Sequence, residues 1–208
     1  MRVLLGLLLV VAPSFAQSDT PFSLIQVSRQ FDETGALKSE TRFLFAVNRN
    51  GSIVCVDLDP ASGATRQILD RIHGNQILIN PKARWASIMA YRVPRQSPEA
   101  CERRFVSGFR DARVSVEKLA GSIQGVEVER VSVESPNRGG MDVYLAPSLG
   151  CQMLRTVSRL DSRVLETSVA ENLRIGDPDA ALFRIPDGYR VTDVFVKGGT
   201  ARARPLSK

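Results

Sequence analysis

Few side chains in this sequence could perform chemistry, and the carboxylates of Asp57 and Asp59 come first among them. Two carboxylates two residues apart in an extended chain lie on one face, where they could act as a general acid and base or bind calcium. A calcium loop beginning at Asp57 would need an acidic residue where Ile68 stands, so that motif fails. A hydrolase built on these two carboxylates stays open as an alternative.

His73 is the only histidine, so a serine or cysteine hydrolase site would have to include it. It stands in Asp70-Arg71-Ile72-His73-Gly74, which we interpret as a turn between two strands, where an exposed histidine needs no function. The sequence contains neither a phosphate-binding loop nor a dinucleotide fingerprint, and its cysteine spacings match no zinc site. We therefore predict no catalytic residue, no metal and no cofactor.

The three cysteines permit one disulfide and one free thiol. Cys55 lies in an apolar strand, 52–58, where a free cysteine acts as a small hydrophobic side chain. Cys101 and Cys151 both stand beside expected loops. A bridge between them would close a loop of about fifty residues and stabilise the fold by about 4 kcal/mol in the chain-entropy model. The sequence alone leaves this pairing open.

Aromatic and methionine side chains form the candidate binding residues. In an all-β domain these side chains ordinarily fill the core. The alternative is that they line an apolar cavity in a curved sheet, which would take a lipid or the hydrophobic tail of a protein. The candidates for such a cavity wall are Phe43, Phe45, Trp85, Met89, Tyr91 and Met153.

Short alternating or apolar runs bounded by turn residues predict a chain made mainly of strands. Asn50-Gly51 is a strong hairpin signal because both residues tolerate positive φ. Short helices are expected from Ser97 to about Phe105 and after Asp177-Pro178-Asp179. About ten strands predict one all-β domain, 17–195, built as a large curved antiparallel sheet or a half-open β-barrel, with a β-sandwich as the alternative. The expected strands are 41–47, 53–58, 65–70, 76–79, 85–93, 114–119, 126–133, 141–146, 151–157 and 164–175.

The N-terminus has the layout of a secretory signal peptide. Arg2 precedes an apolar run that ends near Ala12, and small residues lead to a cleavage site after Ala16. The run is too short to span a bilayer, so we predict a signal peptide over 1–16, a periplasmic or secreted mature protein and no remaining transmembrane segment.

The net charge of +6 comes mostly from the two ends of the chain. Acidic and basic side chains nearly balance over 17–196, which argues against a nucleic-acid partner. The segment 196–208 contains basic but no acidic residues, and we interpret it as a flexible basic tail.

Three segments of the C-terminal half resemble an uncharacterised family of exported bacterial proteins. These segments are 125–129, 141–150 and 176–189, the last containing Pro-Asp-x-x-Leu-Phe-x-Ile-Pro-x-Gly-Tyr. The likeness covers about residues 40–190, and no catalytic residue is assigned to these motifs. More distantly, the order of elements is similar to the lipoprotein-carrier (LolA-like) class, which has a half-open antiparallel barrel covered by short helices.

This resemblance implies a non-catalytic extracytoplasmic protein that binds an apolar ligand, a lipid or a lipidated partner in a cavity of the sheet. Two alternatives stay open, a periplasmic sensor or scaffold that binds another protein through a sheet edge and the carboxylate-based hydrolase. The sequence does not predict an oligomeric state.

Overall fold

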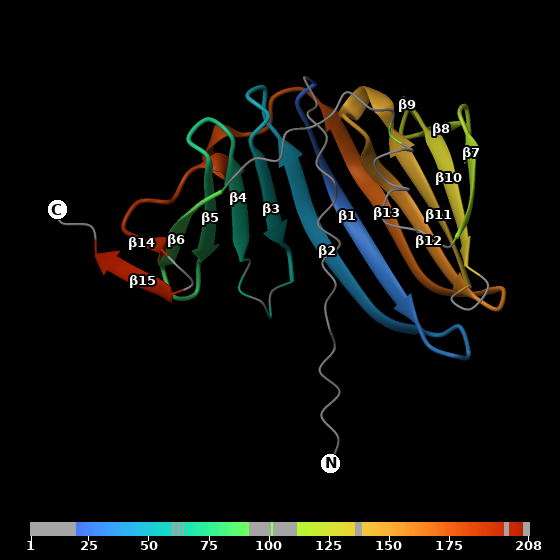
Figure 1. Ribbon diagram of the computed structural model, residues 1–208, viewed down its shortest axis with the longest axis horizontal. Helices are drawn as coiled ribbons and strands as arrows, with labels where there is room; N and C mark the ends of the chain where they lie inside the picture. The colour runs from blue at the N-terminus through green and yellow to red at the C-terminus, as the bar shows by residue number, and fades with distance from the viewer. Residues whose placement is uncertain are drawn as a thin grey trace, which may run out of the picture.

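The computed structural model describes residues 20–59, 61, 63, 65–91, 101, 112–135, 139–197 and 200–205. Thirteen strands form one sheet in the order β15-β14-β6-β5-β4-β3-β2-β1-β13-β12-β11-β10-β7, and β8 pairs with β9 alone. Figure 1 shows that the sheet curves and that β15 and β7 lie at opposite ends, so it does not close into a barrel. The predicted large curved sheet is confirmed, and the described strands do not divide into the two layers of a β-sandwich.

Strand pairing within this sheet is antiparallel, except that β14 pairs in parallel with β6. The bounds are β1 (Phe22–Phe31), β2 (Leu37–Val47), β3 (Ile53–Asp57), β4 (Arg66–Asp70), β5 (Asn75–Asn80), β6 (Trp85–Ala90), β7 (Arg113–Glu117), β8 (Ser122–Ile123), β9 (Val126–Glu127), β10 (Glu129–Ser135), β11 (Gly139–Ala146), β12 (Gln152–Leu160), β13 (Arg163–Ile175), β14 (Arg190–Lys197) and β15 (Thr200–Pro205). Two short 3₁₀ turns, η2 (Pro147–Leu149) and η3 (Ala180–Phe183), interrupt this succession.

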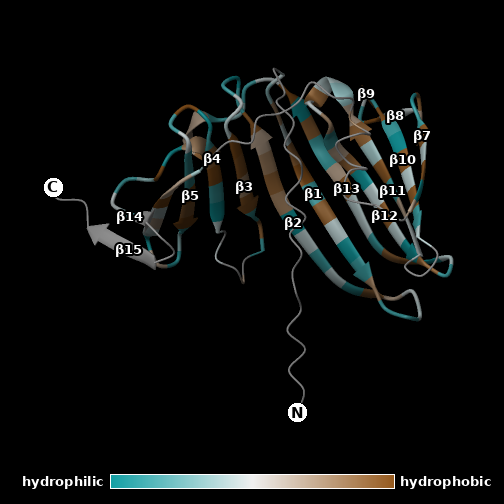
Figure 2. Cartoon of the chain, in the orientation of Figure 1, coloured by the Kyte–Doolittle hydropathy of each residue, from teal (hydrophilic) through white to brown (hydrophobic). Residues whose placement is uncertain are grey.

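The central strands are buried on both faces of the sheet. We call the two faces the Phe45 face and the Ala46 face, after neighbouring residues of β2. The Phe45 face carries a core that includes Phe22, Leu24, Phe45, Val47, Ile53 and Leu69. The Ala46 face carries a second core of Ala46, Val54, Val56, Ile68, Ile79 and Ala86. Burial on both sides explains why β3 is apolar almost throughout, whereas β1 alternates in hydropathy (Figure 2).

The closing segment of the family-like motif covers the Ala46 face. Asp179 caps η3 by accepting a hydrogen bond from the Ala181 backbone N–H, whereas Asp177 pairs with Arg49 instead. Leu182 and Phe183 pack on the Ala46-face core, together with Ile185, Tyr189 and Val191. Arg66 of β4 anchors this cover, because its Nη1 donates to the carbonyl oxygens of Ala181 at 3.2 Å and Leu182 at 3.3 Å.

Several expectations differ from the structure or lie outside it. The sequence did not predict β1, because its buried side chains change face, from Phe22 and Leu24 to Val27. The segment expected to be a flexible tail instead contains the end of β14 and all of β15, which pairs with the open edge of β14. The signal peptide and most of the expected helix 97–105 lie outside the described residues, although Cys101 is helical.

Candidate functional site

All the candidate apolar residues lie on the Phe45 face. Directly paired residues share a face, and the pairs Phe45–Cys55, Cys55–Gln67, Gln67–Leu78 and Leu78–Ser87 carry this face from β2 to β6. Alternation along β6 then places Trp85, Met89 and Tyr91 beside Ser87. In the other direction, Met153 of β12 lies opposite Leu145 and packs on a third buried cluster, which contains Cys101, Val131, Val133, Val143 and Leu145.

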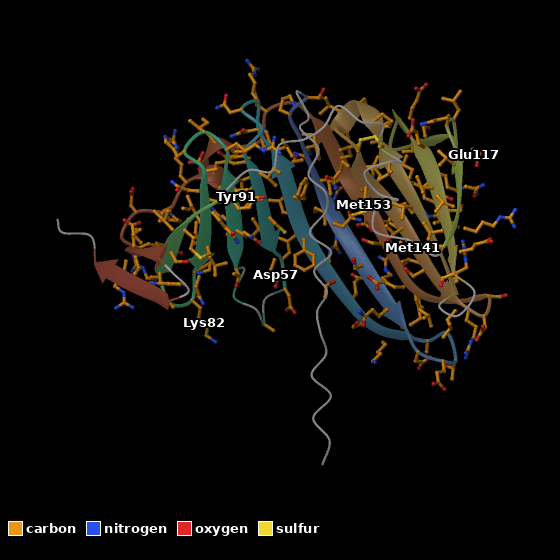
Figure 3. All side chains as sticks on the ribbon, in the orientation of Figure 1. Asp57, Lys82, Tyr91, Glu117, Met141 and Met153 are labelled. Carbon is orange, nitrogen blue, oxygen red and sulfur yellow. A yellow bond between two sulfur atoms is a disulfide. The ribbon has the colours of Figure 1, made fainter. Side chains whose placement is uncertain are left out.

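The structure separates these residues into two groups. Seven strand-to-strand steps divide β6 from β12, which corresponds to about 30 Å along the sheet. Figure 3 accordingly shows Tyr91 and Met153 over different halves of the sheet, with Met141 near Met153. The register therefore sets β6 and β12 apart, so the structure does not bring all the predicted residues to one place on the sheet.

The first group lies on β2 and β6. Phe45 is only 6% exposed and belongs to the core, where its ring centroid lies 5.9 Å from that of Phe22. Phe43, Trp85, Met89 and Tyr91 are partly exposed. The indole Nε1 of Trp85 donates to Thr192 Oγ1 at 3.2 Å, so its polar edge is satisfied and the rest of the ring is apolar surface.

The second group surrounds a disulfide. The structure joins Cys101 to Cys151, with their Cα atoms 5.4 Å apart, a pairing that the sequence left open. Cys101 is buried against β10 and β11, and Met141 and Met153 pack at the margin of this cluster. The bridge therefore ties the helical residue Cys101 to the sheet, which gives Met153 a structural role.

Cys55 is the free cysteine of the described residues and lies on the Phe45 face beside Phe45. Burial, with a smaller contribution from the charge of Asp57, raises the pKa of its thiol to about 11. The thiol is therefore protonated at neutral pH and a poor nucleophile. It adds uncharged surface to the face.

The polar candidates organise turns. The Asp57 carboxylate accepts from the Asp59 N–H at 2.9 Å, and the Asp59 carboxylate accepts from the Ala61 N–H at 2.8 Å. His73 is 69% exposed on its side chain, and its Nδ1 lies 2.6 Å from Asp70 Oδ2. These contacts are those of loop-stabilising groups.

Within the described ranges, no three His, Cys, Asp or Glu side chains are grouped so that they could hold a metal ion. The same ranges contain no helix with the length and apolar character needed to cross a bilayer.

A pocket lies away from both groups, where the tips of the β1–β2 and β12–β13 hairpins meet. Phe31, the turn 32–35, Arg163 and Val164 line it. The Asp32 carboxylate accepts a side-chain hydrogen bond from Thr34 and backbone hydrogen bonds from Ala36 and Thr34, and these lower its pKa. The same hydrogen bonds hold the turn in place. The carboxylate of Asp32 therefore serves the hairpin rather than a ligand.

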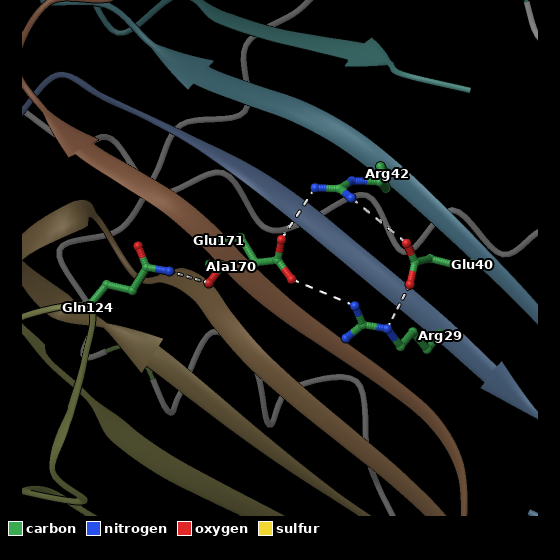
Figure 4. A network of polar contacts seen from close by, with 6 residues as sticks. All are labelled: Arg29, Glu40, Arg42, Gln124, Ala170 and Glu171. Atoms are coloured by element: carbon green, nitrogen blue, oxygen red, sulfur yellow. Dashed lines mark hydrogen bonds and ion pairs between the residues drawn. The ribbon is translucent and has the colours of Figure 1, made fainter. Parts of the chain in front are cut away.

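An ion network that sequence reasoning missed lies on the Ala46 face (Figure 4). Arg29 Nε lies 2.7 Å from Glu40, and Arg42 lies 3.3 Å from Glu171, across β2, β1 and β13. Two longer contacts, Arg29–Glu171 and Arg42–Glu40, close the ring. The charges balance, and the ring spans three strands around the fully buried Val27, so we interpret it as structural. Sequence spacing gives no signal for such a network, because the contacts depend on strand register.

Comparisons with known proteins agree on the fold alone. No family model matches the chain, and no curated protein matches it. An uncharacterized conserved protein from Thermus thermophilus is similar in structure, with 13% identity, 84% of this chain and 91% of that chain covered, and a TM-score of 0.52.

Two further solved structures are more distant. The alignment with MucB covers 84% of this chain and 60% of the MucB chain at 13% identity, with a TM-score of 0.48. The alignment with a LolA superfamily protein from Nitrosomonas europaea covers 81% of this chain and 90% of that protein at 11% identity, with a TM-score of 0.33.

Proposed function

We propose that this chain is a non-catalytic exported protein that binds an acyl chain, either free or attached to a partner protein, on the Phe45 face of strands β2–β6. One observation carries the proposal. Phe43, Leu78, Trp85, Met89 and Tyr91 are all partly exposed on that face, where the register sets Leu78 of β5 beside β6 and leaves Phe43 on β2, beyond β3 and β4. An apolar surface that monomeric proteins normally cover is a candidate ligand surface.

The opposite face of the same strands supports this assignment by contrast. There, the segment that contains η3 covers the core with Leu182, Phe183 and Tyr189, and Arg66 holds it in place. The Ala46 face therefore already has its partner within the chain. The Phe45 face of β3–β6 instead presents the partly exposed Leu78 and Met89.

The chemistry of this surface fits a hydrocarbon chain. Between Phe43 and Tyr91, the inner strands contribute one carboxylate to the face, that of Asp57 opposite Phe43, and otherwise the uncharged side chains of Cys55, Gln67, Gln76, Leu78 and Ser87. The high pKa of Cys55 keeps that thiol neutral. Because charged groups bind water strongly, the uncharged part of this strip, from β4 to β6, loses little by being covered, whereas Asp57 marks its charged margin on β3.

A hydrolase has less support. Asp57 and Asp59 are engaged with backbone N–H groups of their own turn, and His73 is exposed beside Asp70. Neither arrangement brings a nucleophile and a base together. We therefore propose binding without catalysis, and export rests on the signal peptide predicted for 1–16.

The test uses Trp85, which is the only tryptophan and lies within the proposed surface. Titration of the mature protein with a long-chain fatty acid should shift its emission to shorter wavelength and saturate. In a second titration, a diacylated lipopeptide replaces the fatty acid. Tighter binding of the fatty acid would indicate a free acyl chain as the ligand, and tighter binding of the lipopeptide would indicate an acyl chain attached to a partner protein. Met89→Gln should weaken binding about tenfold, the loss expected when a polar amide faces a hydrocarbon.

Ile72→Gln is the matched control, because Ile72 is 63% exposed in the β4–β5 turn. This variant should bind like the unmodified protein. The proposal is overturned if neither probe changes the emission of Trp85, or if both variants bind equally well.

A further inference from the structure

The outer strand β7 carries an unusual pattern for a sheet edge. Its five residues, Arg113–Glu117, read Arg-Val-Ser-Val-Glu. Alternation places Arg113, Ser115 and Glu117 on one face, and Val114 and Val116 on the other. The strand ends the sheet, and Figure 3 shows Glu117 at that end of the molecule.

Several devices that normally protect an edge strand are missing here. β7 contains no proline or lysine, and it pairs with β10 from Arg113 to Glu117 without a bulge. Val116 is 39% exposed, and Leu119 just beyond the strand is 78% exposed. β10 is the one strand paired with β7 in the described part of the chain. A regular strand with a free edge can accept a further strand by backbone hydrogen bonds.

The residue pattern of β7 is complementary to itself. If two copies pair antiparallel about a two-fold axis at Ser115, Arg113 of each copy lies opposite Glu117 of the other. Val114 then lies opposite Val116, and the two Ser115 residues face each other. Opposite charges and β-branched residues directly across from one another stabilise an antiparallel pair, and the same patch serves both copies.

Other registers lose this complementarity. A parallel pairing in register would set Arg113 against Arg113 and Glu117 against Glu117, which is repulsive. An antiparallel pairing shifted by two residues in either direction separates Arg113 from Glu117. The charges of β7 therefore select one register and one orientation.

Both charged side chains are accessible. Arg113 is exposed, and Glu134 of β10 lies directly opposite it on the same face. Glu117 is 50% exposed on its side chain, and its Oε2 contacts Arg130 at 2.8 Å, which leaves Oε1 available. Arg130 would add a second positive charge beside the Arg113–Glu117 pair on the same face.

We propose that two copies of this chain associate through β7 and form a dimer with one continuous sheet. The paired strands are short, so the interface is smaller than the standard size and the dimer should form in the micromolar range. The proposed acyl-chain surface on β2–β6 lies on the far side of β1, β13 and β12 from β7, so the two proposals are independent.

Sedimentation velocity over a concentration series tests this dimer. The unmodified protein should pass from monomer to dimer, and added salt should weaken the association, because charges contribute to it. Arg113→Glu alone and Glu117→Arg alone should each weaken it at least tenfold. Lys38→Glu is the charge-matched control, since Lys38 is exposed on β2 away from the edge, and it should dimerise normally.

Two combinations separate edge pairing from a folding defect. The double variant Arg113→Glu/Glu117→Arg restores both opposite pairs and should dimerise within about threefold of the unmodified protein. An equimolar mixture of the two single variants should also associate, because each copy then carries the charges that the other needs. A monomer at every concentration, unchanged dimerisation of the single variants, or a mixture that stays monomeric overturns the proposal.

Discussion

Gln124 takes the place of a β12 partner for Ala170, which lies one residue beyond the last pair between β12 and β13. Its Nε2 donates to the Ala170 carbonyl oxygen at 2.9 Å (Figure 4), and its Oε1 accepts from the Leu173 N–H at 2.7 Å. Between these two residues β13 is irregular, since its register against β1 shifts there and Asn172 has a φ of 52°. The side chain of Gln124 thus fixes the β8–β9 hairpin to the irregular part of the strand.

Gln124→Ala should therefore lower the free energy of unfolding by about 1–2 kcal/mol, because two backbone groups of β13 lose their partner. Gln124→Glu should cost less, since it keeps the acceptor for Leu173 and loses the donor for Ala170. Urea denaturation gives both values, with Ser122→Ala, an exposed neighbour on β8, as the control. Equal stability of Gln124→Ala and the unmodified protein would show that the hydrogen bonds contribute nothing.

Phe183 stabilises the cover of the Ala46 face less than its motif suggests. The sequence predicts a buried side chain and a loss of about 3–5 kcal/mol on Phe183→Ala. The structure leaves Phe183 partly exposed, so we expect about 2 kcal/mol. The reference is Leu154→Ala, which empties a site that is 0% exposed and should cost about 3–4 kcal/mol. Guanidinium denaturation that ranks Phe183→Ala above Leu154→Ala would contradict this description.

Asp142 should make stability depend on acid pH. Partial burial alone would raise its pKa, but hydrogen bonds from Ser132 and Arg159 outweigh burial and lower it. The unfolded carboxyl, with a pKa near 3.9, takes up its proton at a higher pH than the folded one. The contribution of Asp142 to the free energy of unfolding is therefore complete above about pH 4 and is lost as the pH falls through the pKa of the folded state.

Asp142→Asn should cost about 1–3 kcal/mol at neutral pH, as for hydrogen bonds to a charged group, and progressively less as the pH falls below about 4. Denaturation curves over an acid pH series provide the measurement. A cost that stays the same over the whole series would mean that the charge of Asp142 is not involved.

The disulfide should contribute more than any single side chain considered above. Replacing both Cys101 and Cys151 by serine should lower stability by about 4 kcal/mol, since the bridge spans 50 residues. Cys55 serves as the internal control, because its pKa of about 11 predicts very slow alkylation of the folded protein at neutral pH. Free thiols at all three cysteines of the protein isolated from an oxidising compartment would contradict the pairing.

The sequence predicted the fold class because short alternating or apolar runs bounded by turn residues mark most of the strands. The prediction failed where neither kind of run is visible. In β1 the buried side chains move from Leu24 on one face to Val27 on the other, so no single alternation is visible. β15 is a strand only because β14 offers it an edge, and composition gives no sign of that.

The sequence gives the residue types of the proposed surface but not the order of the strands that carry them. Phe43, Trp85, Met89 and Tyr91 do share a face, as alternation within β2 and β6 implies. Met153 belongs elsewhere, because β1 and β13, which are far apart in the sequence, separate its strand from β2. The order of strands in a sheet depends on long-range pairing, which spacing along the chain does not contain.

The central claim is that an acyl chain binds the Phe45 face, and photolabelling tests it most directly. A fatty acid with a diazirine near the end of its chain is bound to the mature protein, irradiated and located by peptide mass spectrometry. We expect labels in β2 and β6, on the peptides that contain Phe43 and Trp85–Tyr91, and an excess of unlabelled fatty acid should remove them. Labels confined to 180–189 on the Ala46 face, or labels that excess fatty acid does not remove, would contradict the claim.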